Sequence, residues 1–202
     1  SLATALTLSR IQAQASLVEQ VVKDHVKYGA SSSSRSTLTP AFFVNVYPFE
    51  SKLLAVRAFA KKSFRMPTFN DLYYADMGNS KLNPESALQY DLGFVLNKDW
   101  KQGIVDHLRL QVDGYYNTVY DKIVAYPKGQ QFRWTMLNLG KVHIKGVDAM
   151  AEVGLEPAKD WKVTARLQYT YQDARDVTDP NTSYYKDQIP YIPWHSGSAI
   201  LG

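Results

Sequence analysis

The feature that most constrains this chain is a strict alternation of apolar and polar side chains from Trp161 to Tyr171. The odd positions carry Trp, Val, Ala, Leu, Tyr and Tyr, whereas the even positions between them carry Lys, Thr, Arg, Gln and Thr. Only a β-strand places alternate residues on opposite faces, so the pattern predicts a strand with one apolar and one polar face. About ten steps of about 3.3 Å, tilted by about 40°, rise roughly 25 Å, which is the height of a barrel's apolar band.

Similar alternation along the chain predicts an all-β protein of about nine antiparallel strands. The expected strands cover residues 1–10, 16–28, 38–48, 52–64, 86–97, 106–125, 132–155, 161–174 and 193–202. Residues 16–28 also fit an amphipathic helix, because Leu17, Val18, Val21 and Val22 form a helical stripe. We interpret this segment as a strand because its neighbours are strands.

The composition excludes several classes of protein. The 202 residues contain no cysteine, which excludes disulfide scaffolds and thiolate zinc sites, and a net charge of +4 is too small to indicate nucleic-acid binding. No apolar run reaches the roughly 18 residues that a transmembrane helix needs. Aromatic residues make up 13% of the chain. Trp161 and the pair Tyr169 and Tyr171 would lie at opposite ends of one spanning strand, where aromatic girdles occur.

Short and long connections alternate along the chain. The short ones are Pro48–Lys52, Lys98–Val105 and Glu156–Asp160, and the long, polar ones are Gly29–Thr37, Arg65–Pro84 and Arg175–Pro193. An up-and-down transmembrane β-barrel sorts its connections in this way, with tight periplasmic turns and long extracellular loops. We therefore predict a barrel in which the loop Arg65–Pro84 is extracellular and the turn Lys98–Gln102 is periplasmic. A soluble sheet remains the alternative interpretation.

In such a barrel the apolar strand face meets lipid and the polar face lines the lumen. Ala165 and Leu167 are expected to face lipid. The expected lumen-facing residues are Arg109, Asp113, Arg166 and Gln168. For each of these four, a solvated strand face without a specific role is the alternative. An odd strand count does not close a bacterial barrel and Ser1 begins no signal peptide, so residues 1–202 are expected to form one partial barrel domain of a longer protein.

One stretch of the chain resembles the TonB-dependent outer-membrane receptors. In that family an aromatic-Arg-x-Pro element ends one strand, and a Gly-Asn…Leu-x-Pro-Glu element opens the next. The matching residues are Phe64, Arg65, Pro67, Gly78, Asn79, Leu82, Pro84 and Glu85. The similarity extends over about residues 38–202 and includes Asn138-Leu139-Gly140-Lys141 and Ile189-Pro190-Tyr191-Ile192-Pro193.

The resemblance implies part of a barrel of about 22 strands whose lumen is filled by a plug. It also implies active import of a ferric siderophore, haem or cobalamin across the bacterial outer membrane, driven by the partner TonB acting on a plug that this sequence does not contain. Further implied partners are the nutrient, outer-membrane lipids with lipopolysaccharide, and a surface lipoprotein. A passive porin without a plug is the alternative function, and a soluble all-β binding module is a third.

Specificity in this interpretation lies in the extracellular loop after Phe64. Phe69, Tyr73 and Tyr74 offer flat apolar surfaces, and Asn70 and Asp71 offer polar contacts, so these five residues are the candidate ligand-binding set. Packing within the loop or an interfacial girdle is the alternative role of the aromatic side chains.

The sequence predicts no metal site, no cofactor and no enzymatic activity. Haem receptors of this family carry a ligand histidine between a Phe-Arg-Ala-Pro box and an Asn-Pro-Asn-Leu box. Here the boxes read Phe64-Arg65-Met66-Pro67 and Asn79-Ser80-Lys81-Leu82, with no histidine between them. The histidines at 25, 107, 143 and 195 lack the His-x-x-His or His-x₃-His spacing of a metal site, and no Gly-x-Ser-x-Gly motif marks a nucleophile.

Overall fold

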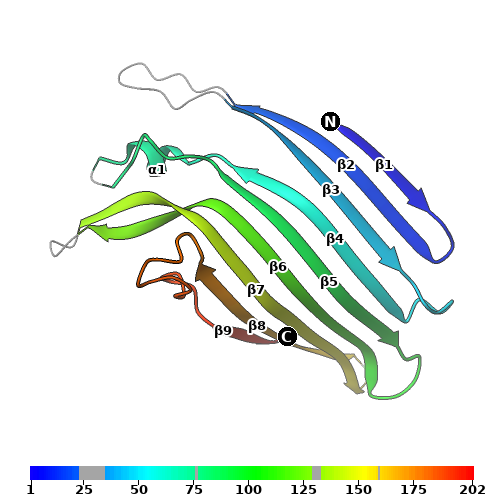
Figure 1. Ribbon diagram of the computed structural model, residues 1–202. Helices are drawn as coiled ribbons and strands as arrows, with labels where there is room; N and C mark the ends of the chain where they lie inside the picture. Colours follow the sequence, from blue (N-terminus) through cyan, green and yellow to red (C-terminus); the bar gives the residue numbers. More distant parts are fainter. Residues whose placement is uncertain (23–34, 76, 129–132, 159) are drawn as a thin grey trace.

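The computed structural model describes residues 1–22, 35–75, 77–128, 133–158 and 160–202. Within them, nine strands form one antiparallel sheet in which every strand pairs with its neighbours in the chain, so β1 and β9 are its edges (Figure 1). The strands are β1 (Leu2–Thr7), β2 (Ile11–Val22), β3 (Arg35–Val46), β4 (Leu54–Arg65), β5 (Glu85–Asp99), β6 (Val105–Lys128), β7 (Arg133–Ala158), β8 (Trp161–Asp176) and β9 (His195–Leu201). One short helix, α1 (Phe69–Tyr73), lies between β4 and β5.

The all-β antiparallel fold predicted from the alternation is confirmed, and so is the strand interpretation of residues 16–22, whereas the loop expected at residues 35–37 is corrected. Residues 16–22 are extended in β2, so the helical alternative fails there; residues 23–28 lie outside the described part of the chain. β3 pairs with residues 11–22 of β2, and β1 pairs with residues 12–17, so the sheet satisfies backbone groups of β2 in the extended form and overrides its helical periodicity. Residues 35–37, expected in a loop, belong to β3.

The register gives the sheet two chemically different faces. Leu167 pairs with Ala151 and Ala199, and these positions lie on what we call the outer face. Other residues of the outer face are Leu92, Phe94, Leu110, Val112 and Val147. Arg166 pairs with Glu152 on the opposite, inner face. The inner face also carries Arg57, Asp91, Gln111, Asp113 and Asp148.

The apolar outer face has no protein layer over it in the described residues. Leu167 is 60% exposed and Leu92 51% exposed. Tyr90 and Tyr116 border this apolar band at one end of the sheet, and Trp161 lies at the other end. A water-soluble sheet would bury such a face, whereas a barrel wall presents it to lipid between two aromatic girdles. No helix in the described residues is long and apolar enough to cross a membrane.

The two ends of the sheet differ in their connections. The segments 8–10, 47–53 and 100–104 and residue Asp160 gather at one end, which we call the turn rim, at the lower right of Figure 1. The long segments 66–84 and 177–194 lie at the opposite end, the loop rim, together with the extended hairpin of β6 and β7. The predicted sorting of short and long connections therefore holds for the loops Arg65–Pro84 and Arg175–Pro193, whereas residues 29–34 of the third predicted loop lie outside the described part of the chain.

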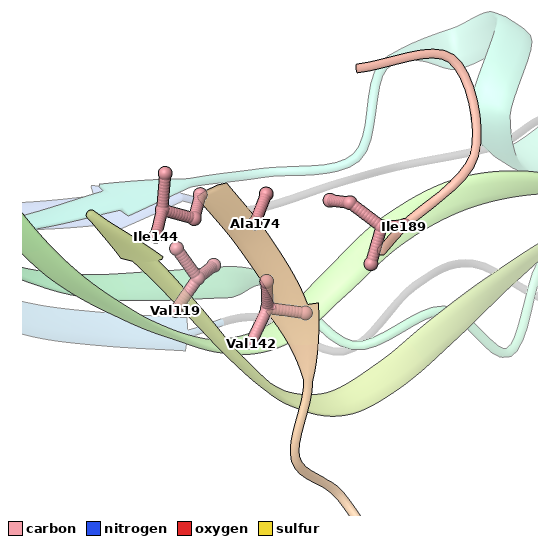
Figure 2. Packing of buried hydrophobic residues seen from close by; sticks show 5 residues of the cluster. All are labelled: Val119, Val142, Ile144, Ala174 and Ile189. Atoms are coloured by element: carbon pink, nitrogen blue, oxygen red, sulfur yellow. The ribbon is translucent and has the colours of Figure 1, made fainter. Parts of the chain in front are cut away.

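Apart from Val95, the buried apolar residues of the described chain gather in two clusters at the loop rim. One joins Val119, Val142, Ile144 and Ala174 of the sheet with Ile189 of segment 177–194 (Figure 2). The other joins Leu72 and Leu82 of segment 66–84 with Ile123 of β6. Each long loop is thus packed on the sheet by its own small core.

Candidate functional site

The carboxylate of Glu85 holds the base of segment 66–84. Arg65 donates from Nε to Glu85 Oε2 over 2.9 Å, and the backbone amide of Ile123 donates to Glu85 Oε1 over 2.6 Å. Lys122 Nζ lies 3.7 Å from the same Oε1. Because Glu85 is buried, this carboxylate links the ends of β4 and β5 firmly to β6 beneath the loop.

Glu85 and Arg65 lie beyond Tyr90, on the loop side of the apolar band, and both remain charged. Burial by itself raises the pKa of Glu85, but the hydrogen bonds from Arg65 and Ile123 and the charge of Lys122 outweigh it, so the pKa lies below its ordinary value. The hydrogen bond to Glu85 raises the pKa of Arg65 despite partial burial. The loop is therefore anchored by a permanent ion pair at neutral pH.

The helix α1 lies within the segment that the sequence predicted only as a long loop. Thr68 Oγ1 accepts from the Asp71 amide over 3.2 Å, and Asp71 Oδ2 accepts from the Thr68 amide over 2.9 Å. This reciprocal capping box begins the helix. Asp71 also lies 3.5 Å from Arg65. Asp71, predicted to contact a ligand, is thus engaged in holding the loop, and the Thr-x-x-Asp spacing was the sequence signal for the helix.

The Gly-Asn element docks the loop on β7. Asn79 Nδ2 donates to the Met136 carbonyl over 3.1 Å, and the Met136 amide donates to the Met77 carbonyl over 2.9 Å. A side-chain carbon on Gly78 would lie 2.6 Å from the Tyr74 backbone nitrogen, so the chain can turn this tightly only at glycine.

The remaining residues of the family-like motif are also structural in this fold. Pro67, Leu82 and Pro84 are buried, and Leu82 packs in the cluster with Ile123. Phe64 pairs with Ser86 across β4 and β5. The motif therefore specifies how segment 66–84 is anchored, and leaves other residues of the segment to contact solutes.

The aromatic residues of α1 are the exposed part of this segment. Phe69 is 70% exposed and Tyr74 58% exposed, and the rings of Phe69 and Tyr73 lie 6.2 Å apart. Asn70 is exposed beside them. Because the anchoring contacts lie below, these side chains form an apolar surface on a rigid support at the loop rim.

Segment 177–194, predicted as a long loop but not as a binding site, forms a second feature of the loop rim. Ile189 donates its amide to the Ala174 carbonyl over 2.9 Å and packs on the inner-face cluster (Figure 2). Between this segment and the β6–β7 hairpin lies a cavity of about 500 Å³. Its lining includes Tyr126, Leu139, Asp176, Tyr184 and Asp187. In the sequence, the tyrosines and aspartates clustered in this long polar loop were the signal that could have indicated this cavity.

The inner face carries a chain of polar side chains halfway along the strands. Arg57 donates from Nη2 to both carboxylate oxygens of Asp113, each over 2.7 Å, and Gln111 Nε2 donates to Asp113 over 2.8 Å. A side-chain carbon on Gly93 would lie 1.9 Å from Asp113 Oδ1, so glycine leaves the room for this pair. A hollow of about 450 Å³ adjoins it. Arg57 was not among the predicted residues.

The four predicted lumen-facing residues share the inner face. Arg109 and Arg166 both pair in register with Glu152, and Arg166 Nε donates to Glu152 Oε2 over 2.6 Å. Gln168 accepts from Ser198 over 3.2 Å. Asp113 accepts a hydrogen bond from Arg57 of β4, and Gln168 accepts one from Ser198 of β9, so both side chains connect strands of the sheet.

In the described residues no group of three or more His, Asp or Glu side chains is arranged to hold a metal ion. His107 lies at the turn rim beside Asp106, with 3.0 Å between Nδ1 and Oδ2, and His195 Nδ1 lies 2.8 Å from the Tyr169 hydroxyl. His143 packs against Tyr116 on the outer face. His25 is outside the described residues.

A polar inner face, an apolar outer face with aromatic borders, and loops packed inward at one rim define the wall of an outer-membrane β-barrel. The comparisons agree with this class. Residues 17–202 match the model of the family described as TonB dependent receptor-like, beta-barrel. The chain belongs to this family, and it is part of an outer-membrane protein.

The relatives and solved structures that this chain resembles are longer proteins, and this chain spans only part of their length. The vitamin B12 transporter BtuB of Vibrio vulnificus is 28% identical over 118 residues, which are 57% of this chain and 17% of the relative. The copper transporter OprC superposes with a TM-score of 0.65 at 19% identity, over 95% of this chain and 30% of that one. The Serratia marcescens hemophore receptor HasR superposes with a TM-score of 0.62 at 16% identity, over 96% and 39%.

Proposed function

We propose that the whole protein is a TonB-dependent receptor that imports a scarce nutrient of the ferric siderophore, haem or cobalamin class, and that residues 1–202 supply part of its barrel wall and ligand entrance. The observation that carries the proposal is the loop rim. There, two long segments are packed by small cores against the inner side of the sheet, at the rim expected to face outward. A passive pore does not need exposed aromatic rings, such as those of Phe69 and Tyr74, held on a firmly anchored loop.

The aromatic surface of α1 supports a flat, partly apolar ligand. Phe69 and Tyr74 expose large rings at the loop rim, and Asn70 supplies a polar group next to them. Tetrapyrrole and corrin rings offer flat faces that such side chains cover well. Because one sequence relative is a vitamin B12 transporter, cobalamin is the first ligand to test.

The polar chain of the inner face supports a filled lumen. Arg57, Gln111 and Asp113 form a fixed network that can pair with polar groups of a plug without rearranging. The plug would also carry the contact with TonB. The plug and TonB are therefore proposed as partners within the whole protein.

Uptake by cells tests the energy coupling. Cells that produce the whole protein should accumulate labelled cobalamin, haem or ferric siderophore when TonB is present and lose this uptake when TonB is removed. Uptake that persists without TonB would identify a passive porin instead.

Paired variants test the ligand surface. Phe69→Ala with Tyr74→Ala should weaken binding of the transported nutrient to the whole protein by about tenfold or more, because two exposed aromatic faces are lost. Phe49→Ala is the matched control, since Phe49 is 54% exposed but lies at the turn rim. Equal binding by all the variants would move the ligand site away from α1.

A further inference from the structure

The β6–β7 hairpin separates two features of the loop rim. Successive side chains of its paired strands lie on opposite faces. Ile123 and Met136 lie on the face that packs in the cluster holding α1. Val124 and Leu137, one residue along each strand, line the cavity of about 500 Å³ between the hairpin and segment 177–194. In Figure 1 the hairpin lies between α1 and this segment, so the cavity is separate from the aromatic surface of α1.

The cavity has an acidic lining. Among the described residues that line it, the charged ones are Asp176, Asp179 and Asp187, and none is a lysine or arginine. None of these aspartates forms an ion pair in the described part of the chain. The cations next to them in the sequence are directed elsewhere: Arg175 Nε lies 2.7 Å from Asp173, and Lys186 Nζ lies 5.2 Å from the centre of the Tyr185 ring. The cavity therefore carries a net negative charge.

Asp176 supplies a buried carboxylate that is only half satisfied. It is 7% exposed, and its Oδ1 accepts a hydrogen bond from the Thr178 amide over 2.8 Å. Its Oδ2 accepts no hydrogen bond from the described residues. Because no fully buried side-chain oxygen in the described ranges lacks a partner, Oδ2 is open to the cavity that Asp176 lines. A carboxylate oxygen in this position needs a donor, and a charged donor gives the strongest hydrogen bond.

The rest of the lining fits an apolar or aromatic body attached to that donor. Tyr126 of the hairpin is 45% exposed and Tyr184 of the segment 52% exposed, so each wall contributes one tyrosine ring. Tyrosine faces attract ammonium and guanidinium groups. Leu137, Leu139 and Ile189 supply apolar surface. The volume is within the range of small-molecule sites.

Contacts within the chain hold the walls of the cavity in place. Gln188 Oε1 accepts from the Ala174 amide over 3.0 Å, and Thr178 Oγ1 accepts from the Lys141 amide over 3.0 Å. A side-chain carbon on Gly140 would lie 2.6 Å from Thr178 Cγ2, so glycine lets the segment approach β7 there. The cavity is thus formed before anything binds, which lowers the cost of binding.

We propose that this cavity binds a small organic cation, an ammonium or guanidinium group carried on an apolar or aromatic body. Asp176 Oδ2 accepts the hydrogen bond of the cation, the exposed Asp187 adds negative charge, and the two tyrosines cover the attached body. The cation is organic because no group of three or more acidic or histidine side chains in the described residues is arranged to hold a metal ion. The site goes beyond nutrient uptake, since it lies across the hairpin from α1 and does not depend on which nutrient is carried.

Three matched probes test the charge of the occupant. Tryptamine, tryptophol and indole-3-acetate carry an ammonium, a hydroxyl and a carboxylate group on the same aromatic body. In calorimetric titrations of the whole protein in lipid nanodiscs, tryptamine should bind about tenfold more tightly than tryptophol, because it adds a charged hydrogen bond to Asp176. Indole-3-acetate should not bind. Equal binding of the three probes, or displacement of tryptamine by Ca²⁺ at an equal concentration, would overturn the proposal.

Neutral variants test the named residues. Asp176→Asn should weaken tryptamine binding about tenfold and leave tryptophol binding unchanged, since asparagine keeps an acceptor for the Thr178 amide but loses the charge. Asp187→Asn, at an exposed position, should weaken tryptamine binding about threefold, and it provides the test if Asp176→Asn does not fold. Tyr184→Ala should weaken the binding of tryptamine and tryptophol alike.

The matched control combines Asp99→Asn with Asp160→Asn, both exposed at the turn rim. It should bind tryptamine as the wild type does, and heat-dependent gel mobility should show which variants are folded. The cavity is not the site if folded Asp176→Asn and Asp187→Asn both keep full affinity for tryptamine, or if the control loses as much. No transported nutrient enters this test, so its failure would leave the proposed uptake function standing.

Discussion

The loop rim and the turn rim are formed by the same strands but are stabilised differently. At the loop rim a buried carboxylate, Glu85, holds Arg65 and the Ile123 amide, and two apolar clusters pack the long segments on the sheet. At the turn rim the ion pair between Arg10 and Glu50 measures 2.6 Å, but both side chains are at least half exposed. Buried polar contacts fix a geometry, whereas exposed ones add little to stability.

This difference indicates which of the two rims needs a fixed side-chain geometry. The turn rim only reverses the chain, and a few residues with suitable backbone angles do this, such as Gly103 with φ of 114°. The loop rim has to hold exposed aromatic side chains in a fixed position, so it needs a base that does not open. Four predictions can break or sharpen this comparison.

The largest expected difference is in accessibility from outside the cell. In a cysteine-free background of the whole protein, Ser80→Cys should react almost completely with a membrane-impermeant maleimide in intact cells, because residue 80 is exposed at the loop rim. Gln102→Cys, exposed at the turn rim, should react only after the outer membrane is breached. The reverse pattern would invert the topology and remove α1 from the cell surface.

The next largest effect concerns the two glutamates. Glu85→Gln should lower the free energy of local opening of segment 66–84 by about 1–3 kcal/mol, because it weakens a buried charged hydrogen-bond network. Glu50→Gln should change the opening at the turn rim by less than about 1 kcal/mol. Hydrogen exchange of the whole protein in lipid nanodiscs measures both. Equal effects would mean that the loop rim is not specially anchored.

Acid should loosen the loop rim selectively. The pKa of Glu85 is lowered in the fold, so its contribution to stability is complete above its ordinary value of 4.5 and is lost as the pH falls through the lower value in the folded protein. The protection factor of the Ile123 amide should stay constant from neutral pH to about 5 and fall at lower pH. In Glu85→Gln this dependence should disappear; if it persists, another group is responsible.

The smallest expected effect concerns iron ligation. No histidine lies between Pro67 and Asn79, so segment 68–78 cannot supply an imidazole to haem. Replacing that segment by a Gly-Ser linker should leave the absorbance spectrum of haem bound to the whole protein unchanged, even if the affinity falls. Loss of an axial-histidine spectrum in the replaced protein would contradict this prediction.

The sequence predicted the strands well where one face is apolar. Trp161–Tyr171 alternates strictly, and β8 extends over Trp161–Asp176, with Arg166 and Leu167 on opposite faces as expected. Residues 16–22 were ambiguous because their apolar spacing fits a helix and a strand alike. Pairing of these residues with β3, and of residues 16 and 17 with β1 as well, resolved that ambiguity, and such pairing cannot be read from one segment alone.

The candidate site was only partly predictable. Exposed aromatic side chains in a long loop were visible in the sequence, and the structure leaves Phe69 and Tyr74 exposed. The spacing of Thr68 and Asp71 signalled the helix cap, but the role of Glu85 was not visible, because Arg65, Lys122 and Ile123 reach Glu85 only after β4, β5 and β6 have paired.

By itself, the sequence determined which residues alternate, where the chain turns, and which loops are long, since these depend on local spacing and backbone preference. Only the tertiary structure decided which charges meet. Arg57 and Asp113 are far apart in the chain, yet the register of β4, β5 and β6 brings them within 2.7 Å. Likewise, Lys145 and Arg175 come from adjacent strands and share a face, so both reach the buried carboxylate of Asp173. Register fixes such contacts, and register is a property of the assembled sheet.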